Sequence, residues 1–99
     1  METKKLRHNR TTMYKEINVW HRKDDKSLFC FRCFELIPNG GFCVQSADIY
    51  SIDTSANNEL DFKRQFIELL FEDPPEVRSA LFPTLYEAIQ AHIHEFEDL

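Results

Sequence analysis

The two glycines of the 99-residue chain stand together at Gly40 and Gly41, in the segment PNGG at positions 38–41. Asn-Gly tolerates the positive φ angles that tight hairpin turns demand, so this segment predicts a reversal of the chain. Runs rich in apolar residues flank it at 27–37 and from 42 to about 51. The segment therefore predicts a β-hairpin whose two strands are these runs.

A further strand is predicted upstream of the hairpin. The segment MYKEINVWHR at 13–22 alternates in polarity, and Tyr14, Val19 and Trp20 favour extended structure. The polar residues KDDK at 23–26 then form a turn. Together the three strands form an antiparallel meander, in which each strand pairs with the next.

The hydrophobic period becomes helical after the polar segment DTSANN. Asn57 or Asn58 can cap a helix over about 59–72, because short polar side chains accept hydrogen bonds from the first turn. The segment DPPE at 73–76 ends that helix and can start a short one that stops near Phe82.

The segment TLYE at 84–87 is a capping box, and it predicts a last helix that runs to about Glu95 or Phe96. The expected fold is α+β: a three-stranded antiparallel β-meander followed by two longer helices and one short helix packed on one face of the sheet. We expect residues 13–99 to form this single domain, preceded by a basic segment at 1–12 that need not be ordered.

Charge is distributed unevenly along the chain. Residues 1–26 carry eight Lys or Arg against four Asp or Glu, a charge of +4, and the remaining residues carry four against thirteen, a charge of -9. No aromatic residue is interleaved with the basic residues between Lys4 and Arg10, so we do not expect nucleic-acid binding. Neither a membrane span nor a signal peptide is recognisable, and an odd number of cysteines suits a reducing compartment, so we expect a cytoplasmic protein.

The segment LFCFRCF at 28–34 has two cysteines at a spacing that zinc knuckles use, Cys30 and Cys33. Residues three apart on a strand point to opposite faces, and no glycine is present to shape a knuckle. We therefore expect no metal site and treat the cysteines as structural thiols.

The face of the sheet on which the third cysteine, Cys43, lies depends on the register of the hairpin. A two-residue loop places it opposite Leu36, on the face of Cys30, whereas a turn with a bulge places it opposite Glu35, on the face of Cys33. The second register would bring Cys33 and Cys43 near each other. A redox-sensitive pair of these two thiols is the one cysteine function that we consider.

The first long helix carries more apolar surface than one sheet can cover. Its faces are two neighbouring arcs, one of Phe62, Phe66, Leu69 and Leu70 and one of Leu60, Ile67 and Phe71. Either the last helix covers the second arc or part of it is an exposed patch for another chain. The candidate partner-binding residues are Asp61, Glu68, Glu72 and Phe71.

No phosphate loop, catalytic elbow or metalloprotease motif occurs, so we assign no catalytic residue and no cofactor and expect a protein that is not an enzyme. The expected function is a small protein-binding module of the immunity, inhibitor or regulatory type, whose acidic helical surface binds a basic protein. A homodimer that covers the free face of the sheet is a further expectation. The alternatives are a nucleic-acid-associated protein that uses the basic N-terminus, and a small enzyme without a recognisable motif.

Overall fold

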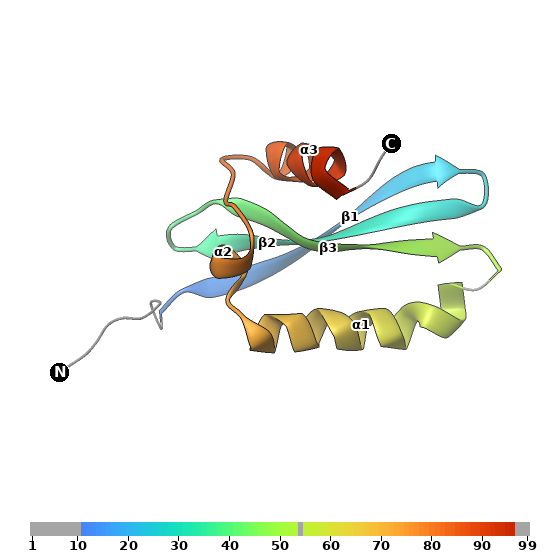
Figure 1. Cartoon of the computed structure of the whole chain (residues 1–99), viewed down its shortest axis with the longest axis horizontal. Helices are drawn as coiled ribbons and strands as arrows, with labels where there is room; N and C mark the ends of the chain where they lie inside the picture. Colours follow the sequence, from blue (N-terminus) through green and yellow to red (C-terminus); the bar gives the residue numbers. More distant parts are fainter. Residues whose placement is uncertain (1–10, 54, 97–99) are drawn as a thin grey trace.

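The computed structural model describes residues 11–53 and 55–96 (Figure 1). The elements are, in chain order, β1 (Met13–Asp24), β2 (Ser27–Ile37), β3 (Phe42–Ser51), α1 (Ser55–Glu72), α2 (Pro75–Arg78) and α3 (Leu85–Phe96). The strands form one antiparallel sheet in the order β1-β2-β3. The predicted α+β fold, a three-stranded meander followed by two longer helices and one short helix, is confirmed. The basic residues before position 11 lie outside the described residues.

The β2–β3 hairpin closes with a longer loop than either predicted register. Gly40 and Gly41 both have positive φ, at 81° and 97°, and Leu36 exchanges backbone hydrogen bonds with this loop. The Leu36 amide donates to the Gly41 carbonyl at 3.0 Å, and the Gly40 amide donates to the Leu36 carbonyl at 2.8 Å. Because both glycines belong to the turn, Cys43 pairs with Phe34 rather than with the residues one or two positions later.

Alternate residues of β2 supply two separate cores. Phe29, Phe31 and Cys33 point to one face, where they pack with Val44 and with Ala88 of α3. The alternate residues of β2 point to the other face, where Phe34 and Leu36 form a second cluster with Cys43 of β3 and Phe66 of α1. Central strand β2 is therefore buried on both sides.

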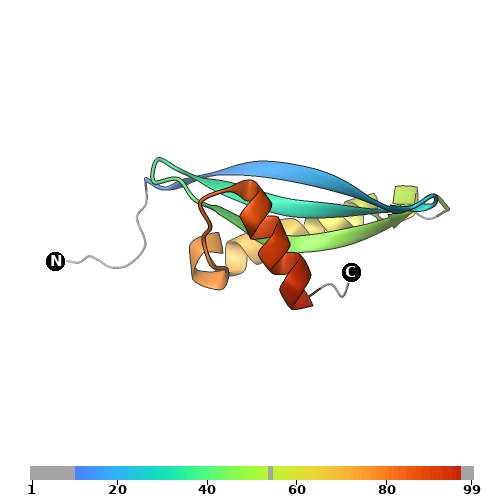
Figure 2. The same cartoon turned by 90° about the horizontal axis from the view of Figure 1, so that it is seen from above.

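The two long helices lie on opposite faces of the sheet. Figure 2 shows α3 in front of the strands and α1 behind them. The Phe66 ring of α1 stacks on Phe34 at 5.2 Å between ring centroids, whereas His92 of α3 contacts Phe31 edge-on at 6.0 Å. The expectation that all helices pack on one face of the sheet is therefore wrong for α3, which packs on the face opposite α1. Helix α3 packs on the face that was expected to be free, and the expectation of a homodimer stays a prediction.

The chain passes from one face to the other around the outer edge of β3. After α2, Phe82 forms an isolated antiparallel bridge with Phe42, and each amide donates to the other residue's carbonyl at 2.8 Å. These two bonds hold the connection against the strand edge. The segment that follows then leads into α3 on the far face (Figure 1).

Local signals place most helix ends correctly. Thr84 Oγ1 accepts a hydrogen bond from the Glu87 amide at 3.1 Å, as the predicted capping box requires. Helix α1 ends at Glu72 as expected but begins at Ser55, four residues before the predicted start. Helix α2 is a single turn capped by Pro74, without a side-chain hydrogen bond from Asp73. Helix α2 ends at Arg78, four residues before the expected position near Phe82.

Candidate protein-interaction surface

Helix α1 leaves a line of large apolar side chains uncovered. Leu60 and Phe71 are 78% and 87% exposed, and Ile67 between them is 37% exposed. Spacings of seven and four residues place the three on one side of the helix, and we call them the α1 ridge. Exposed Arg64 lies on the same side, one turn after Leu60 and one turn before Ile67. Because α3 lies across the sheet, it cannot cover this ridge, so the second apolar arc of the sequence is an exposed patch.

Acidic side chains border the α1 ridge. Asp61, Glu68 and Glu72 lie about 100° further round the helix and are exposed. Arg64 approaches Asp61 at 3.8 Å between charged atoms, and Arg78 approaches Glu72 at 3.3 Å. Glu68 has no ion pair within residues 11–53 and 55–96. The unneutralised charge beside the ridge is therefore negative.

The other basic side chain of α1 points away from this border. Lys63 Nζ lies 3.3 Å from Glu16 Oε1 of β1 and 5.3 Å from the centroid of the Phe66 ring. Lys63 therefore belongs to the contact between α1 and the sheet. The four residues predicted from the sequence, Asp61, Glu68, Phe71 and Glu72, all lie on the solvent side of α1.

A buried polar network lies under α1, and the sequence analysis did not identify it. Arg32 of β2 is only 3% exposed. Its Nε donates to Asp48 Oδ2 at 2.9 Å, and its Nη2 donates to the hydroxyl of Tyr50. Trp20 packs on Tyr50 with 4.9 Å between ring centroids. An arginine within an apolar strand signals a carboxylate on the neighbouring strand, because a buried guanidinium without one is very costly.

All three cysteines of the chain lie in the described part, as fully buried free thiols. Cys33 pairs across the strands with Val44, and Cys43 with Phe34, so Cys33 faces α3 and Cys43 faces α1. The side chains of the suggested redox pair thus point to opposite faces of the sheet. Burial raises the pKa of Cys33 to about 12 and that of Cys43 to about 11. Both sulfurs are therefore protonated and shielded, which disfavours thiolate chemistry.

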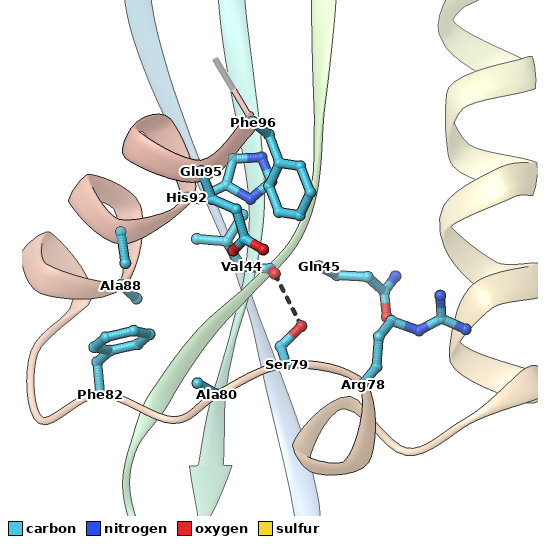
Figure 3. A pocket seen from close by; sticks show the side chains of 11 residues that line it. Val44, Gln45, Arg78, Ser79, Ala80, Phe82, Ala88, His92, Glu95 and Phe96 are labelled. Carbon is cyan, nitrogen blue, oxygen red and sulfur yellow. Dashed lines mark hydrogen bonds between the residues drawn. The ribbon is translucent and has the colours of Figure 1, made fainter. Parts of the chain in front are cut away.

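A second candidate site is a cavity of about 470 Å³ at the outer edge of β3 (Figure 3). Phe82 and Ala88 form an apolar wall on the α3 side, and Gln45 and Arg78 lie on the opposite side. Gln45 Nε2 donates to the Phe66 carbonyl at 3.0 Å, whereas its buried Oε1 has no hydrogen-bond partner among the described residues. The cavity thus combines apolar and polar surface beside a strand edge.

The described residues bring together no group of three His, Cys, Asp or Glu side chains that could hold a metal ion. Within the same ranges no helix has the length and apolar character needed to cross a membrane. No protein-family model, curated protein or solved structure matches the chain. The inference of function therefore rests on the surface chemistry of this molecule.

Proposed function

We propose that this protein is a non-enzymatic binding module, of the immunity, inhibitor or regulatory type, that captures a basic protein through α1. The observation that carries the proposal is the α1 ridge: three large apolar side chains on one exposed line beside a row of acids. Single apolar side chains are common on protein surfaces, whereas these three share one side of α1 beside a polar border. Ile67 and Phe71 are neighbours four residues apart, and Arg64 lies between them and Leu60.

The two components of this surface have different roles in binding. Burial of Leu60 and Phe71 under a partner would each contribute about 1.5–3 kcal/mol, which slows dissociation of the complex. The acids beside them would attract a basic partner over distances comparable to the Debye length and so speed its association. Both contributions are testable because they affect different rate constants.

The apolar component is tested by substitutions at the ends of the ridge. We expect Leu60→Ser with Phe71→Ser to abolish retention of proteins that the wild type captures from an extract of its source. Tyr86→Ser is a matched control, because Tyr86 is 71% exposed but lies on α3, across the sheet. If the Tyr86 variant loses the same proteins, or if the ridge variant keeps them, the ridge is not the binding surface.

The charged component is tested with a purified partner from that experiment. We expect Glu68→Lys with Glu72→Lys to lower the association rate constant at low salt and to flatten its dependence on salt. Asp25→Lys with Glu87→Lys gives the same change in net charge at exposed positions outside α1. Equal effects from the two double variants would show that net charge, rather than the α1 surface, controls encounter.

A further inference from the structure

The two outer edges of the sheet differ in how they are protected. Edge strand β1 carries the charged residues Lys15, Arg22 and Lys23, which discourage the pairing of another strand. The segment of β3 from Gln45 to Ile49 has neither Lys, Arg nor Pro. The segment begins with a bulge at Gln45, where the register with β2 shifts, and it contains the inward-pointing Asp48. After the bulge, no Lys, Arg or Pro opposes a further strand.

The chain itself already pairs with the beginning of this edge. Phe42 and Phe82 exchange two backbone hydrogen bonds of 2.8 Å, and Ser79 Oγ donates to the Val44 carbonyl at 3.3 Å. Within the described ranges, no other strand continues this pairing beyond Val44. The backbone of β3 is thus engaged at one end of its outer edge and available for pairing further along.

The cavity beside Val44 and Gln45 lies where the internal pairing stops. In Figure 3, α3 flanks it on one side and α1 on the other, with the residues after α2 below. Glu95 lies at the α3 side and makes no ion pair with any described residue, whereas Arg78 is already close to Glu72 and Asp73, at 3.3 and 3.5 Å. Among the Asp, Glu, Lys and Arg side chains that line the cavity, the one without an ion pair to a described residue is therefore the negative Glu95.

We propose that the outer edge of β3, from Gln45 to Ile49, binds an extended segment of a partner protein as a fourth strand. A basic side chain of that segment lies in the adjoining cavity, with its aliphatic part against Phe82 and Ala88 and its charge toward Glu95. This site is separate from the α1 ridge, and its proposal does not depend on the function proposed for the ridge.

Hydrogen-bonding groups of the backbone identify the ligand as a polypeptide. A strand edge presents amides and carbonyls at a regular spacing that an extended peptide matches, and pockets beside it select alternate side chains. Ser46 and Ala47 are small, so they leave room for a close approach of another backbone. The cavity at one end selects for the basic side chain.

The test uses amide chemical shifts of the whole protein, titrated with a synthetic peptide of alternating valine and lysine about six residues long, the usual length of a strand. We expect saturable shifts of the amides from Gln45 to Ile49 and of residues near Glu95. The same peptide with methylated backbone nitrogens should bind more than about tenfold more weakly, because it loses its backbone donors.

Two matched variants test the role of charge. Glu95→Gln should weaken binding about two- to fivefold, as expected for one exposed charge pair, whereas Glu87→Gln on the same helix should have no effect. The Phe71→Ser variant should bind the peptide like the wild type, which separates this site from the α1 ridge.

Four results would overturn the proposal. The first is the absence of shifts at millimolar peptide, and the second is shifts confined to other surfaces. The third is equal binding of the methylated peptide. The fourth is a set of edge shifts that grows with protein concentration alone, since the strand would then come from a second copy of this chain.

Discussion

The two faces of the sheet hold their helices by different interactions. On the α3 face, Phe29, Phe31 and Val44 form an apolar cluster against the helix, and the polar ring of His92 on α3 also contacts Phe31. On the α1 face, apolar packing around Phe66 continues into the buried network of Arg32, Asp48 and Tyr50. Apolar packing tolerates small shifts of a helix, whereas a buried charge tolerates few partners. The comparison indicates that the α1 face tolerates fewer substitutions and smaller helix shifts than the α3 face.

The sharpest way to break this comparison is to remove Asp48. Asp48→Ala leaves the Arg32 guanidinium buried without its carboxylate, and we expect it to lower the free energy of unfolding by about 3–5 kcal/mol. Urea denaturation measures the change. Asp53→Ala, an exposed control two residues after β3, should change stability by less than about 0.5 kcal/mol.

A double variant then tests whether the loss of stability in Asp48→Ala comes from the unpaired charge of Arg32. Arg32→Met with Asp48→Ala removes both buried charges from the α1 face, and it should recover a large part of the loss. A loss below about 1 kcal/mol for Asp48→Ala alone would contradict the importance of the network.

The apolar anchors of the two helices give the next comparison. Phe66 is 2% exposed, so Phe66→Ala should cost about 3–5 kcal/mol. Ile89 of α3 is only partly buried, so Ile89→Ala should cost about 2 kcal/mol, at the lower end of its range. Urea denaturation of both variants checks the order. A larger loss for Ile89→Ala would show that α3 anchors the fold more strongly than α1.

Alkaline pH should affect the α1 face through two tyrosines. Burial raises the pKa of Tyr50 to about 12, and burial together with a hydrogen bond to Glu76 raises that of Tyr14 to about 12, from an ordinary value of 10.0. Well below pH 10 both phenols are protonated in the folded and unfolded states. Between pH 10 and about 12 the unfolded chain ionises first, so stability falls as the pH rises.

Unfolding curves over this pH range test the effect. Buried Cys33 and Cys43 titrate in the same range, so the informative quantity is the difference between wild type and variants. Tyr14→Phe and Tyr50→Phe should each reduce the slope of stability against pH. An unchanged slope in both variants would assign the alkaline loss to other groups.

The smallest expected effect concerns the start of α3. Thr84→Ala removes the hydroxyl that accepts the Glu87 amide, and it should cost about 1 kcal/mol, measured by thermal or urea denaturation. Thr84→Ser keeps the acceptor and should remain close to the wild type. If Thr84→Ser is as destabilising as Thr84→Ala, the methyl group rather than the cap holds this turn.

Much of the local structure was predictable from neighbouring residues. The bounds of β2 and β3 agree with their apolar runs, and β1 extends two residues beyond its predicted end into the expected turn. The exposed side of α1 was also predictable as a candidate site, because helical period places Asp61, Glu68 and Phe71 away from Phe66. The register of the hairpin was not, since it depends on how the loop uses both glycines.

The site residues that sequence reasoning missed require contacts between distant positions. Arg32 meets Asp48 and Tyr50 only after β2 and β3 pair in this particular register. The cavity at Gln45 is lined by residues of β3, of α3 and of the segment around Ser79, which a hydrogen bond to Val44 holds at the edge of β3. Neither contact has a signal within one segment, apart from the presence of an arginine in an apolar strand.

The amino-acid sequence by itself determined the order and type of the elements, because backbone conformation and hydrophobic period depend on residues close together in the chain. Only the tertiary structure decided which face of the sheet each helix covers. Burial of apolar surface has no direction, so the second arc of α1 would pack equally well against α3 or against another protein. The bridge between Phe42 and Phe82 leads the chain around the edge of β3 to the other face, and this leaves Leu60, Ile67 and Phe71 exposed on the surface.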